Sequence, residues 1–538
     1  MSESSSGAGS LVALLVFVVA SVWLGAVAQR IVKRGSFLRG YFLGNRGLGA
    51  WALALTATVQ SGGTFMGFPS LVYSHGWSLT LWIASYMMVP ITGFAMIGKR
   101  LAQLSRRTGA ITLPDLFRER FASPALGVLT LILVLFFMCF MMVAQFKAGA
   151  IVMKVAWPGS GALTLDEAAG DLDYYYYLGL TIFALTVVGY TAIGGFLAAV
   201  WTDLFQSVMM LVGVMILLPL VVGAAGGLEQ GSRIAVEQTG PGFLSPAGYS
   251  ADGRTFLPLG LAFSFFFVWV YAGMGSPAGM VRVMASKNSA TIRKSIVLLA
   301  VYNMLIYLPL IVICICGRAV IPDLAKTDEI IPRLALHTTS SLPGGSLLAG
   351  LILTAPFGAV MATVSSYLVV IASGLVRDLY QRFLHPDASL AQIKRMTYAA
   401  MILVGVVAFV ANLRPVAYLQ ALVVFSGSGG AAAFVVPAAM AAYWRRATAA
   451  GAFAAMAGGA CTILGLYVTG FLSADPGIGQ ATVFRPYFLL GLDPILWGLL
   501  VSLVAGIVVS WLTAPPTPEL VSRMFDAPPA AGECLVQA

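Results

Sequence analysis

The feature that most constrains this sequence is the recurrence of apolar runs long enough to cross a lipid bilayer. A helix needs about 20 apolar residues to cross the hydrocarbon core. Thirteen segments of the 538-residue chain qualify. The sequence therefore predicts an all-α polytopic membrane protein with about 13 transmembrane helices. The expected spans are 10–29, 48–74, 77–98, 124–156, 174–193, 196–225, 255–281, 295–317, 344–375, 395–412, 416–443, 449–473 and 488–513.

The composition agrees with this architecture. Hydrophobic residues make up 59% of the chain and charged residues 10%, whereas a soluble protein has about 25% charged residues. The net charge of +10 lies in short loops between apolar runs. Orientation in the membrane explains it better than nucleic-acid binding, so we expect no nucleic-acid partner.

The loops alternate in charge along the chain. Basic residues gather after odd-numbered spans, as in 30–46 and 99–120, whereas the opposite loops are poorer in them and often acidic. The positive-inside rule then places the N-terminus outside and the C-terminus in the cytoplasm of a cell-membrane protein. The first span is expected to be retained, because its basic residues follow it rather than precede it.

The chain is predicted to form one transmembrane domain over residues 10–513. Residues 1–9 are expected to be a disordered outer segment, and the Pro- and Ala-rich residues 514–538 a disordered cytoplasmic tail. No soluble domain is appended, and no obligatory protein partner is evident. The partners we expect are a small-molecule solute and the lipid bilayer.

Enzyme and metalloprotein classes find little support. The five cysteines include no CxxC motif, and the three histidines are scattered, so neither disulfides nor zinc are indicated. A membrane enzyme would need clustered acid, base or metal ligands. A channel would more often show a repeated filter or rings of like charge. We expect no organic cofactor.

The second span contains the polar, glycine-rich stretch "QSGGT" at residues 60–64. Unpaired backbone at bilayer depth is tolerated only inside protein or along a water-filled cavity. A discontinuous helix there would expose peptide groups that bind ions and substrate. The alternative interpretation is that Gly62 and Gly63 allow close helix packing.

A second interruption lies in span seven, "YAGMGSPAGMVR" at residues 271–282. Spans two and seven are five spans apart, so a five-helix unit repeated with inverted topology would place its first helix at both positions. Paired interruptions in corresponding positions of two halves point to a transporter binding site.

Span nine carries a third signal, a group of small and hydroxyl residues around Thr363, Ser365 and Ser366. One interpretation is tight packing with hydroxyls bonded back to their own helix. The other is a sodium site, because a small hard cation prefers oxygen ligands.

At this point the chain resembles the sodium:solute symporter family, and within it most closely the sodium/pantothenate symporters. The resemblance rests on stretches spread over most of the chain: "YFLGNRGLG" (41–49), "LALTATVQSGGTFMGFPSLVY" (53–73), "RRTGAITLPDLF" (106–117), "YTAIGGFLAAVWTDLFQ" (190–206), "GRAVIPDL" (317–324), "APFGAVMATVSSYL" (355–368) and "YWRRATAAGA" (443–452).

The resemblance implies a leucine-transporter-type five-helix inverted repeat. Repeat one would cover 48–225 and repeat two 255–443, with extra helices at 10–29 and 449–513. It also implies solute import coupled to Na⁺. The sodium ligands it implies are Ala57, Gln60, Ala359, Ala362 and Thr363. The family usually has a hydroxyl at the position of Ala362, and this departure leaves proton coupling open.

Two charged residues also match family positions. The resemblance places Asp203 on the cytoplasmic exit route of sodium, and a carboxylate at this depth is functional by default. The alternative for Asp203 is an ionised residue at a cytoplasmic helix end. Arg282 is expected to face the cytoplasm.

The solute is expected between the two interruptions, where free backbone amides and hydroxyls favour a carboxylate. Lys147 is a counter-charge for an anion if it faces the bundle, and it snorkels to the headgroups if it faces outward. Pantothenate or another monocarboxylate fits these features, with proline as the alternative. The candidate solute contacts are Gln60, Ser61, Gly63, Thr64, Lys147, Tyr271, Phe425 and Ser426.

Overall fold

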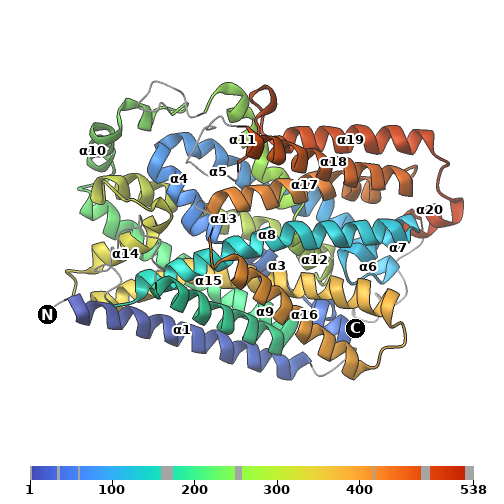
Figure 1. Cartoon of the computed structure of the whole chain (residues 1–538), viewed down its shortest axis with the longest axis horizontal. Coiled ribbons are helices and arrows are strands. Elements are labelled where there is room, and N and C mark those ends of the chain that lie inside the picture. The colour runs from blue at the N-terminus through green and yellow to red at the C-terminus, as the bar shows by residue number, and fades with distance from the viewer. Residues whose placement is uncertain are drawn as a thin grey trace.

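The computed structural model describes residues 3–32, 37–57, 61–158, 174–248, 257–415, 419–473 and 485–526. Nearly all of these residues are helical, and the helices of Figure 1 run mainly along one common direction. Within the described ranges no strand forms, and an isolated bridge joins Leu48 to Ser286. The all-α expectation is confirmed.

Long apolar helices dominate the described part of the chain. Nine are long and apolar enough to cross a membrane, and two bent pairs raise the number to as many as eleven. The nine lie in α1 (Glu3–Val32), α8 (Pro124–Ala156), α9 (Tyr174–Ala224), α13 (Ser289–Val320), α15 (Gly345–Ser373), α16 (Leu390–Ala411), α17 (Leu419–Tyr443), α18 (Ala449–Leu472) and α19 (Pro494–Leu512).

Helix α9 covers two of the predicted spans, 174–193 and 196–225. A straight helix of its 51 residues would be roughly 76 Å long at 1.5 Å per residue, more than twice the thickness of the hydrocarbon core. Gly195 interrupts it at φ 62°. A Cβ there would lie 2.6 Å from the ring of Tyr41. The chain bends at this glycine, while the count of thirteen spans stays a prediction.

Three predicted spans are assembled from shorter helices. Span 48–74 consists of α3 (Ala50–Ala57), the π-helix η2 (Gly63–Gly67) and α4 (Phe68–His75). Span 77–98 consists of η3 (Gly76–Leu79), α5 (Thr80–Met87) and η4 (Pro90–Gly98). Span 255–281 corresponds to α11 (Leu259–Met274) and α12 (Pro277–Met284).

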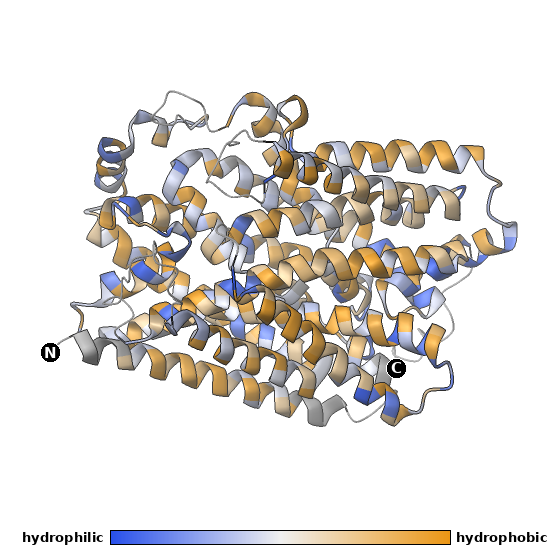
Figure 2. Ribbon diagram, viewed as in Figure 1, coloured by the Kyte–Doolittle hydropathy of each residue, from blue (hydrophilic) through white to orange (hydrophobic). Residues whose placement is uncertain are grey.

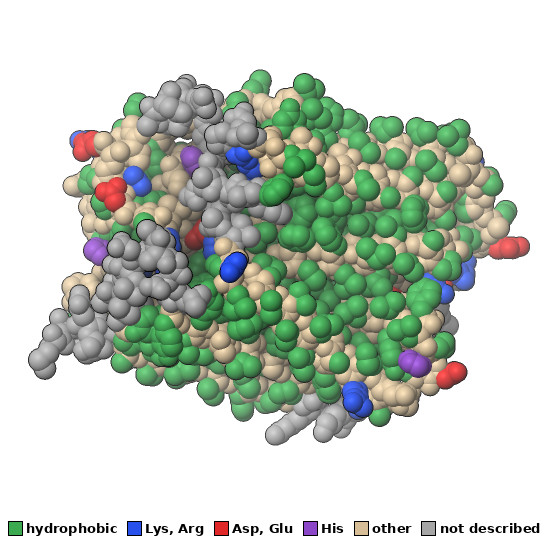
Figure 3. All heavy atoms as spheres, in the orientation of Figure 1, with side chains coloured by type: hydrophobic (Ala, Val, Ile, Leu, Met, Phe, Trp, Pro, Cys, Tyr) green, Lys and Arg blue, Asp and Glu red, His purple; other side chains and the backbone are tan. Residues whose placement is uncertain are grey.

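The core is built around α15 and α17. In each, 83% of the most apolar stretch is buried, against 28% in α1 and α19. The outward-lying α1 and α19 are coloured as mainly hydrophobic in Figure 2. In the space-filling view, hydrophobic side chains cover much of the middle of the visible face, and most of the visible Asp and Glu side chains lie toward its two ends (Figure 3). This distribution fits a bundle surrounded by lipid, with α15 and α17 inside it.

Shorter elements cap the two ends of the bundle. At one end in Figure 1 lie α10 and α14, and at the other lie α6, α7 and α20. We refer to them as the α14 end and the α20 end. These elements are α2 (Phe37–Leu43), η1 (Gly44–Arg46), α6 (Lys99–Thr108), α7 (Leu113–Phe121), α10 (Leu228–Thr239), η6 (Pro241–Leu244), η7 (Thr327–Glu329), α14 (Ile330–Thr339), η8 (Gly374–Leu384), η9 (Leu489–Gly491) and α20 (Pro518–Phe525).

Described helices reach into both terminal segments, residues 1–9 and 514–538. Helix α1 already begins at Glu3, within the segment expected to be disordered. In the tail, Thr517 caps α20 and Pro518 stands in its first turn, which suits a helix start. Met524 is buried, Arg107 donates to its carbonyl oxygen over 2.5 Å, and Arg445 pairs with Asp526.

Candidate functional site

The interruption of span two has its backbone groups bonded by side chains. Helix α3 ends at Ala57, Ser61 is not helical, and η2 begins at Gly63; residues 58–60 lie outside the described part. The amide of Gly62 donates to Oε1 of Gln145 on α8 over 2.7 Å. The amide of Gly63 donates to Oγ of Ser61 over 3.1 Å. Side chains thus replace helical partners inside the protein, as backbone at this depth requires.

The glycine pair also serves packing. A Cβ on Gly62 would lie 2.6 Å from Cβ of Ala148 on α8, and a Cβ on Gly63 would lie 3.1 Å from Val423 on α17. The two interpretations of this stretch, a discontinuous helix and close helix packing, are therefore compatible. The break exists, and its glycines let α8 and α17 approach it.

The interruption of span seven is described completely. Helices α11 and α12 meet at a bend of 45° around Gly275 and Ser276. A Cβ on Gly275 would lie 2.5 Å from Cα of Ala431, so α17 lies directly against this break as well. The hydroxyl of Ser276 caps α12 by accepting from the amide of Gly279 over 3.4 Å. The first turn of α12 begins beside the break.

A cavity lies between the two interruptions. The space between its walls, open solvent included, measures about 1010 Å³. Its walls come from η2, α4, α5, α8, α11, α12, α13, α15 and α17, and much of the surface is aromatic, Met or Gly. The lining residues are Ser61, Gly63, Thr64, Phe68, Ile83, Tyr86, Phe137, Met138, Met141, Trp269, Ala272, Gly273, Gly275, Ser276, Pro277, Tyr307, Thr363, Tyr367, Gln420, Val423, Ser426, Gly427 and Gly430.

Four of the eight predicted solute contacts line this cavity: Ser61, Gly63, Thr64 and Ser426. Gln60 lies outside the described residues. The hydroxyls of Thr64 and Tyr307 are 3.1 Å apart, and Ser426 donates to the carbonyl oxygen of Phe137 over 2.6 Å. These hydroxyls are therefore already engaged within the protein.

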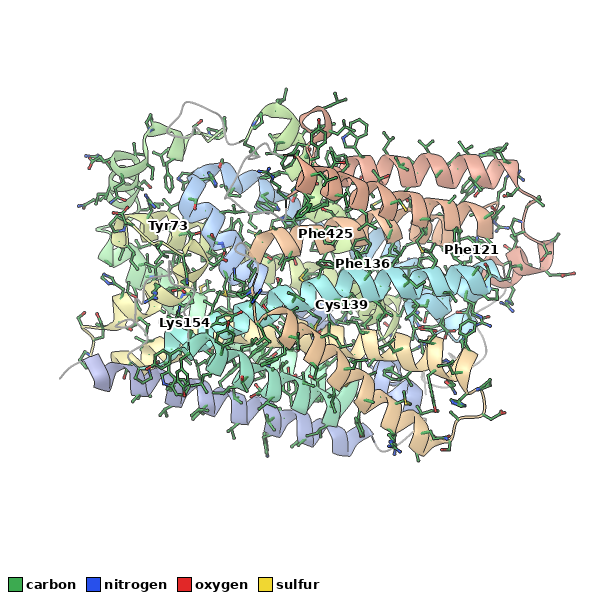
Figure 4. All side chains as sticks on the ribbon, in the orientation of Figure 1. Tyr73, Phe121, Phe136, Cys139, Lys154 and Phe425 are labelled. Atoms are coloured by element: carbon green, nitrogen blue, oxygen red, sulfur yellow. The ribbon has the colours of Figure 1, made fainter. Side chains whose placement is uncertain are left out.

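The predicted contacts Tyr271 and Phe425 are not among the lining residues. Phe425 packs in an aromatic cluster between α8, α17 and α18, with ring centroids 4.9 Å from Phe140 and 4.7 Å from Tyr467. Figure 4 shows it beside Phe136. Tyr271 stacks on Phe267 at 5.8 Å. Phe425 lies 5.6 Å from the ring of the lining residue Phe137 and so supports the wall from behind.

Lys147 is likewise absent from the cavity lining. Lys147 faces the interior of the bundle, which was the first of the two alternatives. Its Nζ, however, lies 3.1 Å from Oδ2 of Asp328 on η7. Seven residues along α8, Lys154 lies 3.8 Å from Glu329, near the α14 end of the bundle in Figure 4. Lys147 therefore joins α8 to the η7 segment.

The predicted sodium ligands on α15 lie in its buried centre. Thr363 lines the cavity, and its hydroxyl donates to the carbonyl oxygen of Ala359 over 2.9 Å. The carbonyl oxygen of Ala362 accepts from Ser365 and Ser366 over 3.0 and 2.7 Å. Hydroxyls thus bond back to their own helix, as the packing interpretation expected.

Asp203 belongs to a buried polar network with Arg282, Ser365 and Ser366. Arg282 donates to Oδ2 of Asp203, to Oγ of Ser366 and to the carbonyl oxygen of Thr56. Ser365 donates to Oδ1 of Asp203 over 3.2 Å. Arg282 does not face the cytoplasm as expected. Its side chain is 3% exposed, because the carboxylate and a carbonyl inside the bundle satisfy its donors.

Sequence patterns missed several functional side chains. The aromatic residues Tyr86, Trp269 and Tyr307 line the cavity from α5, α11 and α13, yet they look like ordinary apolar-run residues. Gln145 and Gln420 carried a usable signal, because an uncharged amide inside an apolar span requires a partner. Gln145 has one in Gly62, as described above.

Comparison with known proteins gives a consistent result. Residues 41–459 match the model of the Sodium:solute symporter family. The chain is 31% identical to the sodium/pantothenate symporter of Escherichia coli, over 92% of this chain and 95% of that protein. It is 32% identical to the Haemophilus influenzae protein of the same name, over 83% and 87%.

A solved structure of similar fold is that of a Na⁺-coupled sialic acid symporter in a substrate-bound outward-open state. The match has a TM-score of 0.68 and 18% identity, over 95% of this chain and 99% of that one. At this identity the likeness concerns the fold, which is the leucine-transporter type that the family resemblance implied.

Proposed function

This chain belongs to the sodium:solute symporter family, and we propose that it imports a small organic carboxylate, such as pantothenate or another monocarboxylate, by sodium-coupled alternating access. It is a multi-pass membrane transporter and not an enzyme. The single observation that carries the proposal is the cavity, whose walls include residues from both interrupted spans.

The electrostatics of the two breaks favour an anionic end on the solute. Span two and span seven have opposite predicted directions, yet in both the second half begins at the cavity. Gly63 opens η2 and Pro277 opens α12, and both residues line the cavity. Helix N-termini carry partial positive charge, so a carboxylate between them is stabilised by two helix starts.

Helix α3 ends at Ala57, beside the break in span two. On this proposal the carbonyl of Ala57 at the end of α3 and Thr363 on α15 bind Na⁺ together with Gln60, Ala359 and Ala362. Carbonyl and hydroxyl oxygens are the ligands that a hard cation prefers. Ala362 supplies only its carbonyl, so H⁺ stays the alternative coupling ion.

Asp203 then lies on the route by which the ion leaves. Ser365 and Ser366 contact both Asp203 and the carbonyl oxygen of Ala362, so the carboxylate is one hydroxyl away from the proposed ligands. With the N-terminus outside, this network lies on the cytoplasmic side of the cavity. An ion passing Asp203 must displace the Arg282 guanidinium.

The solute can be identified by uptake into proteoliposomes. We expect labelled pantothenate to accumulate when Na⁺ is imposed outside, and not when K⁺ replaces it. Counterflow from pantothenate-loaded vesicles should accelerate entry, which a passive pore cannot do. Uptake driven equally by a pH gradient without Na⁺ would favour proton coupling. Transport of proline with no carboxylate transport would favour the amino-acid alternative.

A further inference from the structure

Gln420 lies in the first turn of α17 and is a polar residue of the cavity lining. It is 2% exposed, and among the described residues its carbonyl oxygen Oε1 has no hydrogen-bond partner. Two other polar groups of the lining are engaged within the protein. Thr363 bonds Ala359 and Ser426 bonds Phe137. A buried acceptor without a donor costs free energy, so its retention calls for an explanation.

The amide lies over the glycine face of η2. A Cβ on Gly67 would meet Oε1 of Gln420 at 1.9 Å, and one on Gly63 would meet it at 3.2 Å. The two glycines leave room for the amide group, but its Oε1 accepts no hydrogen bond from them. The terminal torsion of a glutamine side chain is broad, so a small rotation turns the amide from these glycines into the cavity.

We propose that Gln420 determines which carboxylates are accepted, by bonding a hydroxyl or amide group of the solute. This inference rests on the proposed function. An orphan carbonyl oxygen needs an N–H or O–H donor, which a carboxylate does not have. The carboxylate therefore lies toward the helix start at Pro277, and the neutral polar part of the solute lies against Gln420, beside Gly63 and Gly67. A plain aliphatic acid leaves the acceptor unpaired.

The test uses Gln420→Met, which keeps an unbranched side chain of similar size and removes the amide. The full-length protein in proteoliposomes is given pantothenate, which has hydroxyls and an amide N–H, and an analogue of the same length without these donors. We expect the KM for pantothenate to rise three- to tenfold in the variant. The KM for the analogue should stay unchanged, so that the preference disappears.

A second readout separates a recognition role from a structural one. Because the free protein carries an unsatisfied buried acceptor, Gln420→Met should raise the unfolding temperature without solute and lose the further rise that pantothenate gives the wild type. Ser428→Ala is the matched control. Ser428 lies on the same helix, and its buried hydroxyl likewise has no partner among the described residues. It does not line the cavity, and its loss should leave the preference unaltered.

The outcomes are distinguishable. A wild type that transports neither compound with Na⁺ present overturns the proposed function and this inference with it. A wild type that transports pantothenate, with a Gln420→Met variant that keeps the same preference, overturns the role of Gln420 alone. A lower unfolding temperature and equal losses for both solutes would also overturn it, since they indicate a structural residue. Gln420→Leu is the second variant if Gln420→Met does not fold.

Discussion

Arg282 on α12 pairs with Asp203 on α9 inside the bundle, and both side chains are at most 3% exposed. The same guanidinium donates to the carbonyl oxygen of Thr56 on α3 and to Ser366 on α15. One side chain thus joins the second half of broken span seven to three other helices. Removing a partner from a buried ion pair is costly because it leaves an unpaired charge.

Asp203→Asn should therefore destabilise the protein by roughly 3–5 kcal/mol, seen as a lower unfolding temperature in detergent. The double variant Asp203→Asn with Arg282→Met removes both charges and should recover much of that loss. Sodium-driven uptake should stay impaired in the double variant, since the carboxylate on the exit route is still missing. Recovery of uptake together with stability would show that Asp203 has only a structural role.

Thr363→Val keeps the shape of the side chain and removes its hydroxyl. If this oxygen is a ligand, the Na⁺ concentration for half-maximal uptake should rise about tenfold, which corresponds to ~1.4 kcal/mol. Thr363→Ser is the control and should stay near the wild type. Ala362→Ser restores the hydroxyl found in the family and should lower the half-maximal Na⁺ concentration. No change in any of these variants would argue for proton coupling, which uptake at varied pH without Na⁺ would then reveal.

Gln145 stabilises the break in span two through the amide of Gly62. Gln145→Leu leaves that N–H buried without an acceptor and should cost about 1–3 kcal/mol. Gln145→Glu retains an acceptor oxygen for the Gly62 amide, so the hydrogen bond is kept. The variant instead buries a charge, which lowers stability in its own way. Thermal unfolding compares the variants, and solute KM measures whether the break is still shaped for binding. An unfolding temperature for Gln145→Leu equal to the wild type would contradict the assignment.

Lys147 and Asp328 connect α8 to η7 near the α14 end. Each single change, Lys147→Met or Asp328→Asn, should lower stability by several kcal/mol, roughly 3–5 for a buried pair. The double variant should be closer to the wild type. If Lys147 also attracts an anionic solute, its loss should raise the solute KM in the double variant as well. Independent, additive effects of the two changes would indicate that the pair does not interact.

Some features could be predicted from the sequence because they depend on local chemistry. Apolar runs of about 20 residues predicted an all-α membrane-spanning bundle, since a helix of that length is needed to cross the hydrocarbon core. Gly62 and Gly63, and Gly275 with Pro277, indicated both interruptions, because Gly and Pro disturb helices whatever surrounds them. Ser61, Gly63 and Thr64 followed from the interruption in span two, and they do line the cavity.

Only the tertiary structure decided how residues far apart in the chain combine. Asp203 and Arg282 are 79 positions apart in the chain. Nothing in the local sequence around either residue requires that they meet. The same holds for Lys147 with Asp328, for Phe425 behind the wall, and for Gln420 over Gly67. Periodicity determines that a residue lies in a helix, whereas helix packing determines what its side chain faces. The sequence alone therefore determined the membrane-spanning, twice-broken bundle, and packing decided which side chains line the cavity and which support the helices around it.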